Sequence, residues 1–135
     1  MSDLKVLAPI DGSEPSFGAL AFAVEFADRY DADLEVVHLV DKRTEATEEL
    51  LERARMELRD AGLDLEPEVL SDPDAGGVGA STAAADRLLE LIDERGYDHV
   101  VMGRHGGDRR LERLVLGSCS ERLVARAPIP VTVVH

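Results

Sequence analysis

Several residue types and segments are scarce or absent in this chain of 135 residues, and each absence excludes a class of protein. A single cysteine, Cys119, has no partner for an internal disulfide, which fits a reducing cytoplasm. No run approaches the roughly 20 apolar residues that a membrane span needs, and no charged-then-apolar signal segment opens the sequence. We therefore expect a cytoplasmic protein that does not bind or span a membrane.

Length and composition indicate one globular domain. A chain of 135 residues buries one core but is too short for two ordinary domains, and its hydrophobic content of 44% is that of a globular protein. The sequence shows no linker, internal repeat or low-complexity tail. We expect a single domain over residues 1–135.

Lysine is nearly absent, and the chain is strongly acidic. There are 28 Asp and Glu against 15 Lys and Arg, a net charge of −13, and the lysines are only Lys5 and Lys42. Such a surface repels nucleic acid and anionic membranes. It suits a very salty, halophilic cytoplasm, in which ions screen the self-repulsion. Stability that does not rise with KCl would contradict this halophilic interpretation.

The basic residues are concentrated toward the C-terminus. Residues 1–102 hold 9 basic and 25 acidic side chains, a net charge of −16, whereas residues 103–135 hold 6 basic and 3 acidic ones, a net charge of +3. This basic part contains a glycine-bearing stretch, 103–120, with four arginines. Glycine lets backbone N–H groups approach a ligand closely. The coincidence favours an anion site over a chance excess of base.

Apolar runs and helical periodicities alternate along the chain. Five branched or apolar runs predict strands at 4–10, 34–40, 63–70, 99–102 and 131–134. Apolar residues at helical spacing predict four helices at 15–29, 44–61, 81–95 and 118–127. This alternation predicts right-handed crossovers and one doubly wound α/β domain with a mostly parallel, five-stranded sheet.

Local residues indicate where several elements end. Ser81 or Thr82 is expected to cap the third helix, and Gly62 and Gly96 stand where helix C-terminal glycines belong. Pro67 lacks a backbone donor, so the third strand is expected at an edge of the sheet.

Asp11 follows the first predicted strand, and Gly103 follows the fourth. In doubly wound sheets, ligands bind beyond the carboxyl ends of the strands, where the strand order reverses. If these two strands are neighbours, an acidic side chain and a glycine-bearing loop face one crevice. A carboxylate there accepts hydrogen bonds from ribose hydroxyls, and loop N–H groups bind phosphates. Alone, Asp11 is more typical of an ordinary turn; beside the glycine loop, a binding role is favoured.

Other nucleotide-binding and catalytic signatures are missing. The chain has no Gly-Lys-Ser or Gly-Lys-Thr, and no Gly-x-Gly-x-x-Gly follows the first strand. No Ser/His/Asp order, nucleophile elbow or carboxylate pair indicates catalysis, and the four histidines lack metal-ligand spacing. Cys119, at a helix start, is either a thiolate or a small packing residue, and the packing role is favoured.

Four segments resemble the universal stress protein family. The residues that carry the resemblance are 6–13 (VLAPIDGS, first strand and turn), 37–41 (VHLVD, second strand), 101–106 with 116–118 (VMGRHG and LGS, nucleotide loop) and 130–134 (PVTVV, last strand). Together they span nearly the whole chain. The resemblance implies a flavodoxin-like fold, related to the adenine-nucleotide alpha-hydrolases, with strand order 3-2-1-4-5. It also implies ATP or AMP binding and homodimers that pair through the last strand, here Val131–Val134.

The resemblance further implies which residues hold the nucleotide. Adenine and ribose would contact Pro9, Asp11 and Leu39, and Met102 and Gly103 would border the sugar. The positions that match the family's phosphate contacts are Gly106, Gly117, Ser118, Cys119 and Ser120. Two loop residues with side chains suited to phosphate are added to them, Arg104 and His105. A Mg²⁺ ion that accompanies ATP is expected near Asp11, and no metal site built by the protein alone is expected.

The loop has one residue more than the family pattern of glycine, two residues, glycine, nine residues and Gly-Ser or Gly-Thr. Ten residues separate Gly106 from Gly117, whereas nine separate Gly107 from Gly117, so Gly107 is a further candidate residue of the phosphate site. We expect an adenine-nucleotide-binding stress-response regulatory protein without strong catalysis. One alternative is a nucleotide-free dimeric interaction module of the same fold, which the inserted residue and the acidic surface favour. The other is a slow ATP hydrolase or phosphoryl-transfer protein.

Overall fold

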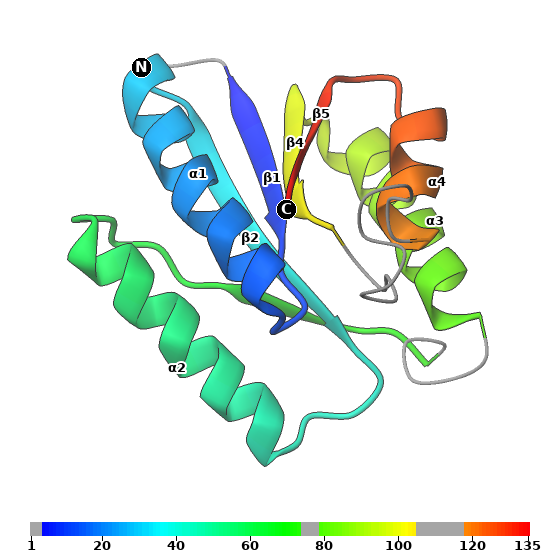
Figure 1. Cartoon of the computed structure of the whole chain (residues 1–135), viewed down its shortest axis with the longest axis horizontal. Coiled ribbons are helices and arrows are strands. Elements are labelled where there is room, and N and C mark those ends of the chain that lie inside the picture. Colours follow the sequence, from blue (N-terminus) through cyan, green and yellow to red (C-terminus); the bar gives the residue numbers. More distant parts are fainter. Residues whose placement is uncertain (1–3, 74–78, 105–117) are drawn as a thin grey trace.

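The structure is a computed structural model that describes residues 4–73, 79–104 and 118–135. Within these residues, five strands alternate with four helices (Figure 1). The strands are β1 (Lys5–Pro9), β2 (Asp33–Val40), β3 (Glu68–Ser71), β4 (His99–Gly103) and β5 (Val131–Val134). The helices are α1 (Glu14–Tyr30), α2 (Glu45–Asp60), α3 (Ala80–Arg95) and α4 (Ser118–Arg126). No helix in this part of the chain is long and apolar enough to cross a membrane.

The strands form one parallel sheet in the order β3-β2-β1-β4-β5. This confirms the α/β class predicted from the alternation and the order implied by the family resemblance. From β1 the chain proceeds outward to β3 on one side, and it then continues with β4 on the other side of β1. The strand order therefore reverses between β1 and β4, which is where open α/β sheets bind ligands.

Helices cover both faces of the sheet, with α1 and α2 on one side and α3 and α4 on the other (Figure 1). Successive strand residues point to opposite faces, so β1 contributes to both cores. Val6 and Ala8 pack in the core under α1 and α2, whereas Leu7 packs in the core under α3 and α4. All three side chains are at most 1% exposed, which explains why β1 is a continuous apolar run.

Most predicted boundaries differ from the structure by one residue, and two of the differences have a clear physical cause. The third strand covers Glu68–Ser71 instead of residues 63–70, because pairing with β2 begins only after Pro67, which has no N–H to donate. Helix α3 begins at Ala80 after Gly79, whose left-handed backbone (φ 79°) takes the N-cap position expected for Ser81 or Thr82. The edge position of β3 is confirmed. The helix-terminal glycines are confirmed too, since Gly62 and Gly96 have φ angles of 79° and 70°.

Ion pairs join the end of α3 to the sheet. Arg95, the last residue of α3, donates to Glu68 on β3 at 2.7 and 3.1 Å, and also to Glu35 on β2. The guanidinium holds the pKa of Glu68 below its usual range. A charged pair that is partly shielded from water contributes more than a fully exposed one. These contacts join the C-terminal end of α3 to the amino-terminal parts of β2 and β3, away from the carboxyl ends of the strands.

We expect His99, at the start of β4, to make the stability of the fold sensitive to mild acid. Its Nε2 lies 2.8 Å from Thr132 Oγ1, its ring packs 4.9 Å from the ring of Phe26, and burial lowers the pKa of His99 below 6.5. At pH values between the pKa of His99 in the folded protein and 6.5, the unfolded chain binds more protons than the folded one. The free energy of unfolding is therefore fully retained above pH 6.5, and part of it is lost as the pH falls through the folded-state pKa of His99.

We expect the melting temperature of the wild type to fall more between about pH 7.5 and pH 5 than that of His99→Gln. The glutamine amide can still reach Thr132 but does not titrate, and all other ionisable groups are common to the two proteins. Thermal unfolding followed by circular dichroism at both pH values measures the difference. Equal pH dependence in the two proteins would contradict the assignment to His99.

Candidate functional site

A pocket of about 240 Å³ opens at the carboxyl ends of β1, β2 and β4, where the strand order reverses. Helices α3 and α4 close the side opposite α1. The lining residues are Pro9, Ile10, Asp11, Ser16, Val37, His38, Leu39, Ala84, Leu88, Met102, Gly103 and Cys119. Apolar side chains therefore form most of the pocket wall, and the polar side chains in it are Asp11, Ser16 and His38. A mostly apolar wall with a few polar groups that can orient a ligand is the usual composition of a small-molecule site.

The turn from β1 into α1 holds the carboxylate of Asp11. Its Oδ1 accepts hydrogen bonds from the backbone N–H of Ser13 at 2.9 Å and from the Ser13 hydroxyl at 2.5 Å. Ser13 in turn caps α1, since its Oγ accepts from the N–H of Ser16 at 3.2 Å. Gly12 between them has a φ of 90°, which favours glycine. The turn thus places one negative charge at the pocket.

The end of β4 passes unusually close to the first turn of α1. A Cβ atom added to Gly103 would lie 2.5 Å from the carbonyl oxygen of Pro15 and 2.5 Å from the nitrogen of Ser16. Both are backbone atoms, so no side chain can rotate away to make room. The absence of a side chain at Gly103 therefore lets β4 and α1 meet at the edge of the pocket.

Cys119, the second residue of α4, is a buried thiol in the pocket wall. Its surface is 4% exposed. Burial, together with the negative charge of Asp11, raises the pKa of Cys119 to about 11. Of the two roles that the sequence left open, the structure supports the packing residue, because a thiol with this pKa stays protonated at neutral pH.

We expect Cys119 to react slowly with iodoacetamide. At about pH 8 the thiolate fraction, and hence the alkylation rate, should be roughly 200-fold lower than in the urea-unfolded chain, where the thiol has an ordinary pKa near 8.5. The rate in the folded protein should keep rising toward pH 11. Mass spectrometry of the time course measures both rates. Similar rates in the folded and unfolded protein would show that the thiol is neither buried nor shifted.

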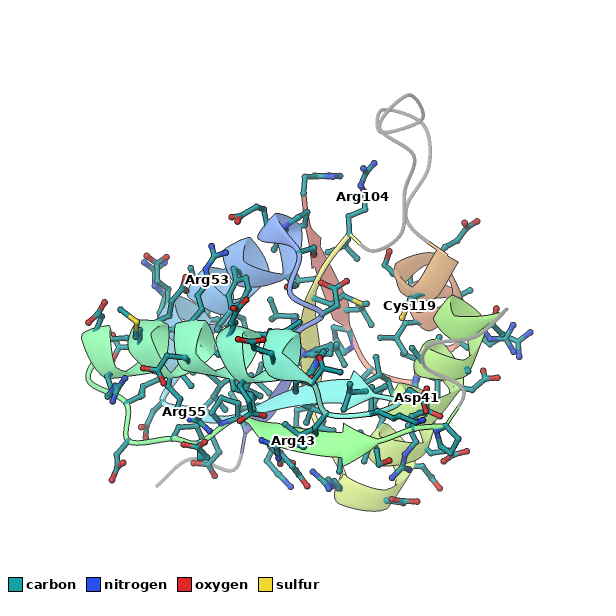
Figure 2. The ribbon with its side chains drawn as sticks, turned by 90° about the horizontal axis from the view of Figure 1, so that it is seen from below. Asp41, Arg43, Arg53, Arg55, Arg104 and Cys119 are labelled. Atoms are coloured by element: carbon teal, nitrogen blue, oxygen red, sulfur yellow. The ribbon has the colours of Figure 1, made fainter. Side chains whose placement is uncertain are left out.

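The structure brings together six of the residues predicted for the site. Those that line the pocket are Pro9, Asp11, Leu39, Met102, Gly103 and Cys119. Arg104 follows β4, where its N–H donates to the carbonyl oxygen of Val134 at 2.9 Å, and Figure 2 shows it at the end of that strand. Ser120 is fully buried and lies outside the lining. Four predicted positions lie outside the described residues, His105, Gly106, Gly107 and Gly117, as does the side chain of Ser118, the first residue of α4.

Six lining residues were not predicted from the sequence, namely Ile10, Ser16, Val37, His38, Ala84 and Leu88. Ala84 and Leu88 are four residues apart on α3 and therefore share one face of that helix. Helical periodicity places such residues toward the sheet but does not distinguish a core contact from a pocket wall. In the described part of the chain, no group of three or more His, Cys, Asp or Glu side chains is arranged to hold a metal ion.

Comparisons with known proteins agree with this geometry. A sequence model of the Universal stress protein family matches residues 4–135. A universal stress protein of Methanocaldococcus jannaschii is 30% identical, over 96% of this chain and 81% of the relative. A universal stress protein crystallised in complex with cAMP is 26% identical, with a TM-score of 0.72 and coverage of 98% of this chain and 96% of the other.

A second structure, the universal stress protein from Archaeoglobus fulgidus in complex with dAMP, has a TM-score of 0.70 over the full length of both chains. Its sequence identity of 20% shows a shared fold alone. The match of the family model over nearly the entire chain is the stronger finding. This chain belongs to the universal stress protein family.

Proposed function

We propose that this protein binds an adenine nucleotide, ATP or AMP, in the pocket at the carboxyl ends of β1, β2 and β4, and that it acts as a stress-response regulatory protein without strong catalysis. The observation that carries the proposal is the pocket itself, at the reversal of strand order and beside Asp11. The complex of a 26% identical family member with cAMP supports an adenine nucleotide as the ligand.

The described residues suit the adenosine half of the ligand. Leu39 and Leu88 offer apolar surface for an adenine ring, and Met102 would border the sugar. Asp11 offers carboxylate oxygens to the ribose hydroxyls, which are hydrogen-bond donors. Hydrogen bonds to a charged acceptor are stronger than those between neutral groups. Base and sugar would thus occupy the space between β1, β2 and α3.

The phosphates are proposed to extend past Gly103 and Arg104 toward the glycine loop and the start of α4. Figure 2 shows Arg104 at the end of β4 and Cys119 at the start of α4. The N-terminus of a helix and backbone N–H groups attract anions. This half of the site depends on His105, Gly106, Gly107, Gly117 and Ser118.

Where Mg²⁺ accompanies ATP, Asp11 is the carboxylate in the pocket lining that can take part in holding it. Mg²⁺ is usually held by one or two carboxylates together with substrate phosphates and waters. A single carboxylate fits that pattern, in which the phosphates and waters supply the remaining ligands.

Isothermal titration calorimetry with ATP and with AMP, at several KCl concentrations, tests the proposal. We expect binding of at least one nucleotide, and the absence of binding at every KCl concentration would overturn it. In Gly117→Val a side chain is added in the loop, so phosphate binding should weaken while circular dichroism stays unchanged. If that variant binds ATP with wild-type affinity, the assignment of phosphate binding to the glycine loop is wrong, whereas the proposed contacts to adenine and ribose are not affected.

We further propose a cytoplasmic homodimer of single-domain chains, paired through β5. Strand β5 lies at an edge of the sheet, and all four of its residues are partly exposed. An exposed edge presents unpaired backbone groups to a second chain. Sedimentation at physiological salt should show a dimer, and a monomer at all concentrations would exclude this pairing.

A further inference from the structure

His38 bonds the chain segment that leads to Asp11. It lies on β2, is 8% exposed, and has its Nδ1 2.8 Å from the carbonyl oxygen of Ile10. A carbonyl oxygen only accepts hydrogen bonds, so Nδ1 must carry the proton and donate it. The N–H of Ile10 donates to the carbonyl oxygen of Val37, also at 2.8 Å. Strand β2 therefore fixes Ile10 at both of its backbone polar groups.

This arrangement acts directly on Asp11, because the carbonyl of Ile10 and the N–H of Asp11 belong to one peptide group. The described residues contain no cis peptide bond, and a planar trans peptide directs these two groups in opposite directions. Fixing the Ile10 carbonyl thus fixes the backbone from which the Asp11 side chain departs. Beyond that point, the Asp11 carboxylate is held by Ser13. Asp11 is therefore constrained from both sides.

We propose that His38 is a positioning residue of the nucleotide pocket, and that its hydrogen bond to the Ile10 carbonyl holds the carboxylate of Asp11 in the orientation that receives the ribose hydroxyls. The inference rests on the proposed nucleotide binding and adds to it His38, which acts on the ligand through Asp11. A binding group that is already held in place loses less freedom when the ligand binds. Without the His38 donor, the buried Ile10 carbonyl lacks this partner, and the turn has a reason to rearrange.

Two substitutions at position 38 separate this role from simple packing. In His38→Asn the side-chain amide nitrogen takes approximately the place of Nδ1, so the bond to Ile10 is kept. In His38→Leu the volume is similar but the donor is lost. Should His38→Leu fail to fold, His38→Gln replaces it, since its amide nitrogen takes the place of Nε2, which makes no bond to Ile10. Circular dichroism and thermal unfolding establish that each variant is folded.

Calorimetry with ATP and with dideoxy-ATP, which lacks both ribose hydroxyls, gives a readout that a merely structural role would not move. We expect the wild type and His38→Asn to prefer ATP. His38→Leu should lose about tenfold in ATP affinity while its affinity for dideoxy-ATP changes little. The ratio of the two affinities should then approach one. An unchanged ratio in His38→Leu would overturn the proposal.

Nuclear magnetic resonance of the ligand-free protein tests the same role without any nucleotide. Imidazole nitrogen shifts should show the proton of neutral His38 on Nδ1, and the amide resonances of Asp11 and Ser13 should move in His38→Leu and return in His38→Asn. A proton on Nε2, or unmoved resonances, would overturn the positioning role. If the wild type binds neither ATP nor AMP, the proposed function fails, and these spectra still decide whether His38 positions Asp11.

Discussion

Replacing Gly103 with alanine is expected to lower the free energy of unfolding by about 2 to 3 kcal/mol, at the upper end of the usual cost of overpacking. The new Cβ would lie 2.5 Å from Pro15 O and Ser16 N, which belong to the first turn of α1. Relief requires β4 or α1 to move, and both carry core residues of the same cluster, Val101 and Phe17. Urea unfolding followed by circular dichroism measures the loss.

Gly18→Ala is the matched control for Gly103→Ala. Gly18 lies inside α1, and a Cβ there would meet Val134 Cγ1 at an ordinary 3.8 Å. Alanine in a helix interior is favoured over glycine by roughly 0.5–1 kcal/mol, so this variant should be more stable than the wild type. The same added methyl group should therefore have opposite effects at the two positions. Destabilisation of similar size in both would contradict the close approach of β4 and α1.

The movement of β4 or α1 in Gly103→Ala should also weaken nucleotide binding, because Gly103 and Ser16 both line the pocket. Fold and site are therefore coupled at this point. The sequence predicts Gly103 as a residue that borders the sugar, at the start of a glycine-bearing loop whose backbone can approach a ligand closely. The structure adds a different requirement, which is the absence of any side chain against α1.

Strand positions were predictable where a run is buried on both faces, as in β1, or pairs along its full length, as in β5. The alternation of residues 63–66 misled the prediction because burial and ladder pairing are separate properties. Leu63 and Leu65 pack against the core under α1 and α2, but their backbone pairs with no strand. Periodicity reports which side chains are buried and does not report where the backbone hydrogen bonds go.

The pocket was predictable to the extent that it follows from chain direction. Asp11 lies just beyond β1 and Gly103 ends β4, so the pairing of these two parallel strands brings them together. His38 could not be found in the same way, because its partner, Ile10, is 28 residues away and is a backbone carbonyl. Every residue type has a backbone carbonyl, so the identity of residue 10 does not indicate this hydrogen bond.

The excess of basic side chains in residues 103–135 overstates the positive charge of this region in the folded protein. Arg122, on α4, pairs with Asp86 on α3 at 2.8 Å, so its charge is balanced within the fold. Arg104 directly follows β4, at the carboxyl end of that strand (Figure 2). The net charge of residues 103–135 counts Arg122 in full, although Asp86, which lies outside that segment, offsets it.

Replacing Asp11 with asparagine is expected to weaken the binding of ATP or AMP by about tenfold to a hundredfold, since hydrogen bonds to charged groups contribute roughly 1.5–3 kcal/mol. The asparagine oxygen can still accept from Ser13, so the turn into α1 should persist and the melting temperature should change little. Calorimetry measures the affinity. Asp41→Asn is the control, because Asp41 is an exposed carboxylate just beyond β2 that does not line the pocket.

The same substitution has a second expected effect that needs no nucleotide. The negative charge of Asp11 contributes to raising the pKa of Cys119, so its removal should lower that pKa and speed alkylation of the thiol. Asp41→Asn should leave the alkylation rate as in the wild type. Faster alkylation with unchanged nucleotide affinity would place Asp11 beside Cys119 but exclude it from ribose binding. An unchanged rate would contradict the proximity of the two side chains, because burial alone would then account for the shifted thiol.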